Sequence, residues 1–495
     1  MSFFCLLGYV RITSCGLLDG RGVDEVFKHS DTTRKTNKRK WKRAVAFVTA
    51  VQILSFALLP TAGMVAALGD QVLVAQGEKA TENKPAPGQN AAGPTKESLG
   101  LNVKSAILME ASTGQIVFNY NADNALPPAS MTKMMSEYIV MEKVKSGEIT
   151  WETEVTASEN ASLTGGSRIF LAQGDKHTVK DLYIAMAIGS ANDATVALAE
   201  QIAGSEQEFV KIMNDTAKKL GMETAHFINS TGLGRDDMPD KFKPQSKEET
   251  VMSATDVAKL VRAIVVDHPE FNQFTTIQNY KFRERDQSPI VNLNWMLEAN
   301  KDVPSFKRYA YQGLDGMKTG FTDEAMYCFA GTAMRDNMRL ISVVMGTEST
   351  GARFTETAKL LDYGFGNVEV KQAVASKQAV QGHETAPIKK GVDTEIAAVT
   401  ESNVSFVTDK GTNFDDSNLT KEVKLIPEDE LVAPIKSGQK VGTVTYTYKA
   451  KGGEQKQTVN LVAAEDMEKG SWWRLFFRAI KYFFVDLFKS IGDLF

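Results

Sequence analysis

A proline pair followed by a helical pattern constrains this chain more firmly than any other stretch. Pro127 and Pro128 end a loop, and proline is tolerated just before or within the first turn of a helix. The residues that follow, to about Lys145, are good helix formers with apolar side chains at helical spacing. The pattern therefore predicts Ser130 at or near a helix start and Lys133 one turn further on, on the same face.

A serine and a lysine so placed could carry out nucleophilic catalysis. A serine hydroxyl is a poor nucleophile until a base removes its proton. Lys133 could be that base if burial or a neighbouring cation kept it neutral. The plain alternative is that Ser130 only caps the helix and Lys133 is a solvated charge. For an isolated S-x-x-K pattern this alternative is the better one, because the pattern is common by chance.

Two further motifs change this balance. Ser-Ala-Asn at 190–192 lies between two helical patterns, and Lys-Thr-Gly at 318–320 precedes an apolar run typical of a strand. The ordered set S-x-x-K, S-D-N and K-T-G occurs in class A β-lactamases and penicillin-binding proteins. Each triplet alone is weak evidence, but three in this order within one domain-sized segment indicate an active site of this type.

The flanking residues indicate which family the chain resembles. Asn-Ala-Leu-Pro-Pro-Ala-Ser-Met-Thr-Lys at 124–133 and Asp-Gly-Met-Lys-Thr-Gly at 315–320 closely resemble the D-alanyl-D-alanine carboxypeptidases, the low-molecular-weight penicillin-binding proteins of serine peptidase family S11. The resemblance runs from about Leu101 to the C-terminus. It implies an α/β serine-transpeptidase, β-lactamase-like catalytic domain, in which an antiparallel sheet has helices on both sides.

The resemblance also implies an activity and its catalytic residues. The enzyme would remove the terminal D-alanine from peptidoglycan stem peptides through an acyl-enzyme, and β-lactam antibiotics would acylate it as covalent inhibitors. Ser130 would be the nucleophile, Lys133 the general base, and Ser190 a proton shuttle to the leaving group. The backbone N–H of Ser130 and one from the strand after Lys318 would form the oxyanion hole. No metal and no cofactor is expected.

Five residues are expected to bind the substrate. Asn192 can donate its amide to a substrate carbonyl while it accepts from a lysine. Lys318 supplies positive charge, Thr319 a hydroxyl for a carboxylate, and Gly320 room for close approach, because it has no Cβ. Arg353 matches a family arginine directed at the substrate's terminal carboxylate, which suits a bidentate guanidinium. The alternative for Arg353 is a surface arginine at a helix start.

A segment within the first hundred residues is expected to direct export. Residues 34–67 combine a basic segment, an uncharged apolar run and a small-residue exit, which describes a secretory signal peptide. Cleavage fits after Ala67 and, as a second option, after Ala75. The rival interpretation is an uncleaved membrane anchor, since the run is close to the lower length for a span.

Two segments flank this signal. Residues 1–33 lie before the basic segment and do not fit the signal peptide, which suggests that the start codon was assigned too early. Residues 68–100 contain a stretch rich in Ala, Pro, Gly, Lys and Glu without periodicity, which predicts a linker.

Composition argues against several other classes. The net charge of -4 disfavours a nucleic-acid binder. Cys5, Cys15 and Cys328 cannot form a disulfide framework or a zinc-type cysteine pattern. The five histidines are scattered and form no His-Glu-x-x-His, so a zinc peptidase is not indicated.

The expected catalytic domain spans residues 101–366, and the sequence pattern changes after it. Short alternating strands separated by turn residues predict a small all-β domain over 367–466. Its sequence contains no recognisable set of catalytic residues, so we expect this domain to be a spacer or a docking surface.

The last segment, 467–495, predicts an amphipathic membrane-anchoring helix. Charged residues fall on one side of a helical wheel, and six charges make a transmembrane span poor. A strong apolar arc with basic residues opposite is typical of a helix in a membrane interface. The alternative is a helix packed on the protein's own core. The apolar arc comprises Trp473, Phe476, Phe477, Ile480, Phe483, Phe484, Leu487, Phe488, Ile491, Leu494 and Phe495.

The sequence therefore predicts an exported serine D-Ala-D-Ala carboxypeptidase at the outer face of the cytoplasmic membrane or in the cell wall. Two rivals remain. A class A-like β-lactamase would place a Glu-x-x-x-Asn loop after its second motif, and no convincing match is found. A non-catalytic wall-binding protein is disfavoured by the intact catalytic motifs.

Overall fold

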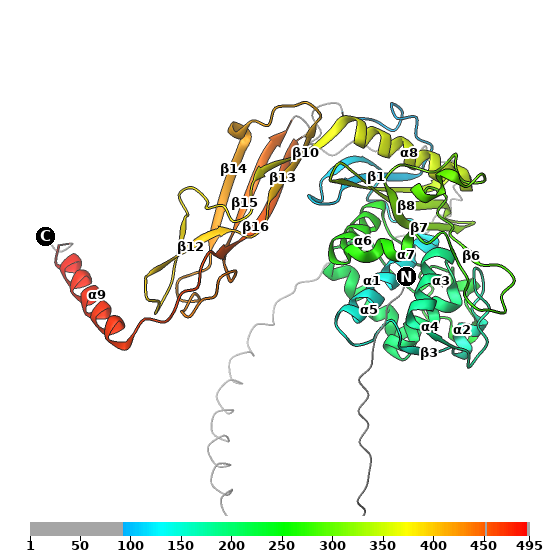
Figure 1. Cartoon of the computed structure of the whole chain (residues 1–495), viewed down its shortest axis with the longest axis horizontal. Coiled ribbons are helices and arrows are strands. Elements are labelled where there is room, and N and C mark those ends of the chain that lie inside the picture. The colour runs from blue at the N-terminus through cyan, green and yellow to red at the C-terminus, as the bar shows by residue number, and fades with distance from the viewer. Residues whose placement is uncertain (1–92, 451–452, 493–495) are drawn as a thin grey trace, which may run out of the picture. The chain divides into compact units, whose positions relative to one another are not determined.

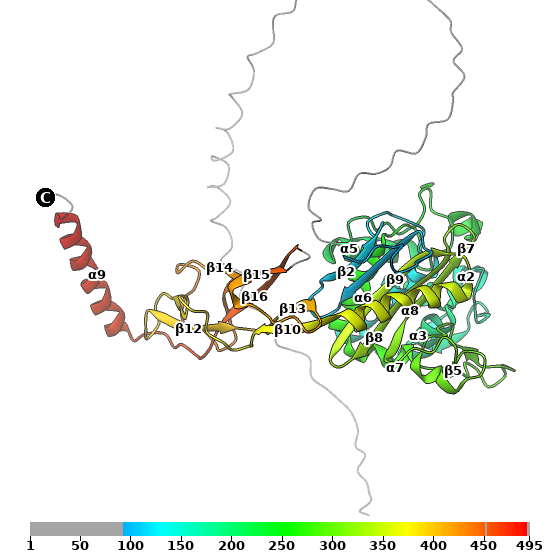
Figure 2. The same cartoon turned by 90° about the horizontal axis from the view of Figure 1, so that it is seen from above.

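Five antiparallel strands form the central sheet of the first domain, in the order β2-β1-β9-β8-β7 (Figure 1 and Figure 2). The structure is a computed structural model that describes residues 93–450 and 453–492. The strands are β1 (Ser105–Glu110), β2 (Ile116–Tyr120), β7 (Leu314–Thr322), β8 (Met326–Arg335) and β9 (Met338–Thr347). Because β1 pairs with β9, the two ends of this domain's chain meet inside one sheet.

Helices cover both faces of this sheet, as the sequence predicted. Alternate residues of β1 point to opposite faces: Ala106 and Leu108 belong to one apolar cluster, and Ile107 and Met109 to the other. On the first face, α8 (Thr350–Asn367) packs against β8 and β9 (Figure 2). On the second face, α6 (Ala254–Asp267) packs against β1 and β9.

The remaining helices gather around α1 (Lys133–Lys145) on the second face. They are α2 (Glu159–Leu163), α3 (Val179–Gly189), α4 (Asn192–Ala203), α5 (Glu206–Lys219) and the short α7 (Asn272–Thr275). Two small antiparallel pairs accompany them: β3 (Glu154–Thr156) with β4 (Lys176–Thr178), and β5 (Asn279–Tyr280) with β6 (Ile290–Val291). Since α1 is buried over its first nine residues, this helical layer forms a core around the predicted nucleophile.

The second domain is all-β, which confirms the prediction from the turn-separated strands. β10 (Val368–Val374) pairs with β13 (Val404–Asp409). A five-stranded sheet has the order β11-β12-β16-β15-β14. Its strands are β11 (Thr385–Pro387), β12 (Glu395–Thr400), β14 (Leu419–Leu425), β15 (Lys440–Ala450) and β16 (Gly453–Ala463). Phe406, Val444 and Leu461 are buried in its core.

The C-terminal segment forms the helix α9 (Trp472–Gly492). Its apolar side chains are exposed, with Phe477 at 61%, Phe483 at 64% and Phe488 at 68%. The alternative of a helix packed on the protein's own core is therefore wrong for these side chains. On the polar side, Arg474 and Arg478 donate hydrogen bonds to backbone carbonyls of the β domain.

Among the described residues, no helix has the length and apolar content needed to cross a bilayer. The predicted signal peptide and the extension before it lie outside the described residues. The structure describes the chain from residue 93, and Leu99 packs against the apolar cluster of the catalytic domain that contains Ala106 and Leu108. Leu99 therefore contacts the catalytic domain although it precedes the expected boundary at Leu101.

Candidate active site

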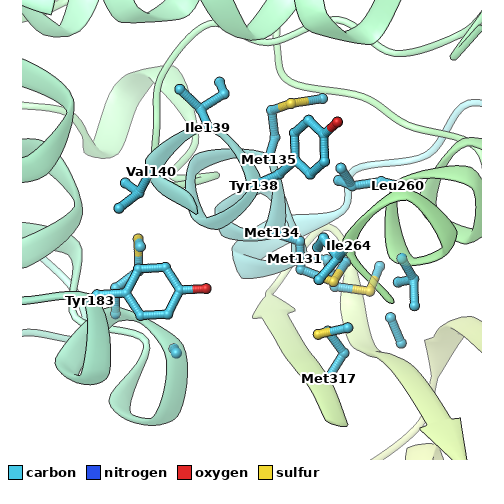
Figure 3. Packing of buried hydrophobic residues seen from close by; sticks show 14 of the residues in the cluster. Met131, Met134, Met135, Tyr138, Ile139, Val140, Tyr183, Leu260, Ile264 and Met317 are labelled. Carbon is cyan, nitrogen blue, oxygen red and sulfur yellow. The ribbon is translucent and has the colours of Figure 1, made fainter. Parts of the chain in front are cut away.

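Ser130 lies in a short 3-10 helix, Ala129–Thr132, that leads into α1. The neighbouring Met131 and Met134 are fully buried near Met317 of β7 and anchor the turn in the core (Figure 3). The backbone of Ala129 has a φ of 48°, in the left-handed region that non-glycine residues rarely adopt. The apolar anchors thus hold a strained turn, which leaves the Ser130 side chain partly exposed.

Lys133 is fully buried and contacts the predicted nucleophile directly. Its Nζ lies 3.0 Å from Ser130 Oγ and 2.7 Å from the backbone oxygen of Thr231. Burial lowers the pKa of Lys133 well below its usual value, and the charge of Lys318 lowers it further. A lysine in this setting can be a neutral amine near physiological pH and can accept the serine proton.

The second motif lies at the junction of two helices. α3 ends at Gly189, Ser190 follows with a φ of 59°, and α4 starts at Asn192. Ser190 Oγ is buried and has no hydrogen-bond partner in the described part of the chain. Asn192 donates its side-chain amide to the carbonyl of Gly165 at 2.7 Å, whereas its Oδ1 is unpartnered. The amide expected to bind substrate is thus partly engaged with the protein.

The third motif lies on β7, the edge strand of the sheet. Lys318 and Thr319 are almost completely buried there. Burial lowers the pKa of Lys318 to about 8, and Arg353 also lowers this pKa, whereas Glu137 raises it. A Cβ at position 320 would lie 2.6 Å from the backbone oxygen of Pro128. The turn that carries Ser130 therefore already requires a glycine here, and close approach of the substrate to Gly320 stays a prediction.

Arg353 lies on α8 but reaches the same strand. It is only 6% exposed, and its Nη1 donates to the carbonyl of Gly320 at 3.3 Å. Its Nε is buried without a partner among the described residues. Burial lowers the pKa of Arg353 to about 10. The alternative of a surface arginine does not hold, and the structure brings Arg353 to the third motif.

Three residues at this site were not assigned a role from the sequence. The Thr231 carbonyl accepts from Lys133. Asp193 is buried and accepts the backbone N–H groups of Ile169 and Leu171, which fixes the loop before α3. Glu137 is buried one turn after Lys133 on α1. Only Glu137 had a signal in the sequence, because its i+4 spacing puts it on the same helical face as Lys133.

Comparisons with known proteins identify the family of this chain. A family model described as D-alanyl-D-alanine carboxypeptidase matches residues 91–349, and one described as the C-terminal domain of penicillin-binding protein 5 matches 369–469. The chain is similar to D-alanyl-D-alanine carboxypeptidase DacF of Bacillus subtilis, with 35% identity over 77% of this chain and 90% of that relative. It is 33% identical to DacC of Escherichia coli over 78% of this chain and 90% of the relative.

Solved structures give the same result. Penicillin binding protein 5 from Haemophilus influenzae aligns with a TM-score of 0.58 and 28% identity, over 77% of this chain and 100% of that chain. A peptidoglycan synthesis regulatory factor (PBP3) from Streptococcus pneumoniae aligns with a TM-score of 0.60 and 30% identity, over 74% and 100%.

A serine–lysine pair at a helix start, beside an edge strand carrying Lys-Thr-Gly, defines a class of acyl-transferring serine enzymes that includes the penicillin-binding proteins. Within this class, the chain belongs to the D-alanyl-D-alanine carboxypeptidase family of S11 serine peptidases and carries the C-terminal domain of penicillin-binding protein 5. It is a serine-type D-Ala-D-Ala carboxypeptidase, which decides against the β-lactamase and the non-catalytic wall-binding protein.

Proposed function

We propose that Ser130 attacks the carbonyl carbon between the two D-alanines of a peptidoglycan stem peptide while Lys133 takes the hydroxyl proton. The observation that carries this proposal is the 3.0 Å contact between Ser130 Oγ and the fully buried Lys133 Nζ. Attack forms a bond from Oγ to the carbonyl carbon and breaks the peptide bond to the terminal D-alanine. Water then hydrolyses the ester, so the enzyme returns with Ser130 free.

Proton transfer and charge stabilisation complete this reaction. Ser190 passes the proton to the leaving amine in this proposal, and its buried hydroxyl without a partner in the described structure supports that role. The oxyanion hole uses the N–H of Ser130 and one from β7 beyond Lys318. Lys318, Thr319 and Arg353 bind the substrate's terminal carboxylate, and Asn192 binds a substrate carbonyl. A β-lactam would enter the same site and acylate Ser130.

The reaction can be tested by assaying the purified enzyme on two substrates. We expect release of free D-alanine from a diacyl-L-Lys-D-Ala-D-Ala peptide, together with slow turnover of a covalently bound penicillin, because the same serine must deacylate in both cases. D-alanine release is measured by a coupled oxidase assay, and penicillin turnover by loss of a fluorescent label from the protein. Rapid hydrolysis of a β-lactam without D-alanine release would contradict this function.

The proposal includes export and attachment to a membrane surface. Cleavage within the predicted signal peptide, residues 34–67, would release the enzyme at the outer face of the cytoplasmic membrane. α9 would then hold it there, because its Trp and Phe side chains are exposed along one arc. Two of its basic residues bond to β-domain carbonyls, so apolar insertion contributes more to attachment than attraction to anionic headgroups.

Deleting residues 471–495 should yield a soluble enzyme that still releases D-alanine, because the proposed catalytic residues all precede α9. The double substitution Phe477→Asp with Phe484→Asp should also release it, because each inserted Phe contributes on the order of 2 kcal/mol. Loss of both should weaken membrane partitioning by at least about 100-fold. Membrane fractionation beside the D-alanine assay measures both effects.

A matched control adds the same charges to the other side of α9. Tyr482 and Val485 are each 50% exposed and lie off the apolar arc. The variant Tyr482→Asp with Val485→Asp should therefore stay with the membrane fraction. If the truncated protein sediments with membranes, α9 is not the anchor.

A further inference from the structure

A buried carboxylate lies on the same helical face as the proposed catalytic base. Glu137 follows Lys133 by one turn of α1 and is 1% exposed. Its Oε1 has no hydrogen-bond partner in the part of the chain that the structure describes. We propose that Glu137 is a positioning residue whose carboxylate stabilises the ammonium forms of both Lys133 and Lys318, so that the proton leaving Ser130 is held at Lys133 while Lys318 keeps its charge. This inference rests on the roles proposed above for Ser130 and Lys133.

The position of Glu137 argues against a purely structural role. Residues four apart on a helix are neighbours, with about 5–6 Å between their Cβ atoms. The adjacent positions Met134, Met135 and Tyr138 fill the core with apolar or aromatic side chains. A carboxylate in this place is costly to bury unless nearby positive charge compensates it. Lys133 and Lys318, exposed by 0% and 2%, are the compensating charges.

Counting charges shows what the carboxylate does during acylation. With Lys133 neutral, the Glu137 carboxylate and the Lys318 ammonium cancel. When the Ser130 proton moves to Lys133 Nζ, a second ammonium forms in the same buried space. Glu137 lowers the energy of that state, and it does so without contacting the substrate. Burial and the charge of Lys318 lower the pKa of Lys133, and the Glu137 carboxylate reverses part of this lowering.

The pKa shifts agree with this geometry. Glu137 raises the pKa of Lys133 and that of Lys318, against the larger lowering that burial causes in both. Burial raises the pKa of Glu137 to about 7, and the two lysines act in the opposite direction. The pKa values of Lys133 and Lys318 therefore both depend on the charge of Glu137, so a change at Glu137 should move both limbs of a pH profile.

Other charged groups surround this cluster, but they have different partners. Asp193 accepts two backbone N–H groups of the loop before α3, and Glu206 accepts from the backbone and hydroxyl of Ser230. The Tyr183 hydroxyl donates to Met141 Sδ at 3.0 Å. Among the described residues, Asp193 from α4 and Glu206 from α5 raise the pKa of Lys133, and Arg353 from α8 lowers that of Lys318. Tyr183 from α3 is the further titratable group beside Glu137, and Glu270 also acts on it.

The variant Glu137→Gln removes the charge and keeps the shape. Without the carboxylate, the pKa values of Lys133 and Lys318 fall, since the negative charge that raised them is gone. The acid limb, which requires a neutral Lys133, and the alkaline limb, which requires a charged Lys318, should therefore both move to lower pH. We expect a displacement on the order of one pH unit. The measurement is the rate of acylation by a fluorescent penicillin across pH.

Two controls separate charge from packing. Glu137→Asp keeps a carboxylate and should displace the profile less than Glu137→Gln. Glu142→Gln removes a carboxylate from the same helix at a side chain 45% exposed, and it should leave both limbs in place. Glu137→Met tests a variant that needs no buried polar group, since replacing buried charge by an apolar residue is often tolerated by the fold. The pH profile of Glu137→Met should move to lower pH by as much as that of Glu137→Gln.

A rate that falls equally at every pH in the Gln and Met variants, with both limbs unmoved, would overturn the inference and leave Glu137 a packing residue. Failure of the proposed function gives a different result. In that case acylation would survive the loss of Ser130 itself, whatever the Glu137 variants do.

Discussion

Replacing Ser130 by alanine should abolish both D-alanine release and covalent labelling by penicillin. The reason is that both reactions require a bond from Ser130 Oγ, and no other hydroxyl is bonded to Lys133 Nζ within the described structure. Removing the nucleophile of a serine enzyme costs on the order of 10⁶ in kcat. The measurements are in-gel fluorescence after penicillin treatment and the D-alanine assay.

Ser136→Ala provides the matched control for this prediction. Ser136 lies on the same helix, and its hydroxyl donates to the backbone oxygen of Ser230 at 2.8 Å. The substitution should cost about 1 kcal/mol of stability and leave labelling intact. Labelling that persists in Ser130→Ala would show that another residue is the nucleophile, and the whole assignment of roles would fail with it.

Sequence patterns predicted the parts of this fold that depend on local periodicity. β1, β8 and β9 are short apolar runs, and each is buried because helices cover both faces of the sheet. The apolar arc of α9 was also readable, since 3.6-residue spacing alone defines it. All the predicted site residues except Arg353 came from three short motifs in a fixed order, which needs no knowledge of their distances. Arg353 came from the family resemblance.

Features that depend on tertiary contacts could not be predicted. The burial of Arg353 arises because α8 packs beside β7, and a helix-start arginine gives no sign of this. The partners of Gly320 and Asn192 come from loops distant in sequence. β11 gives no clear signal in the sequence, because three residues ending in a proline carry almost no strand pattern.

The strongest test of the base is the conservative substitution Lys133→Arg. It replaces a group whose pKa burial lowers with a guanidinium that stays protonated in proteins. The arginine cannot take the Ser130 proton, so acylation by penicillin should fall by about 100- to 10,000-fold. Raising the pH should not restore the rate of acylation in Lys133→Arg. In an enzyme that retains Lys133, a higher pH would restore this rate by deprotonating the lysine.

Lys145→Arg is the control, because Lys145 lies at the exposed end of the same helix and donates to the backbone oxygen of Asp267. It should acylate at the normal rate, and both variants should unfold cooperatively by circular dichroism. Since Lys133 Nζ is held between Ser130 Oγ and the Thr231 carbonyl, a bulkier guanidinium also displaces one of these contacts. A near-normal acylation rate in Lys133→Arg would therefore mean that the proton leaves Ser130 by another route and that Lys133 only positions the hydroxyl.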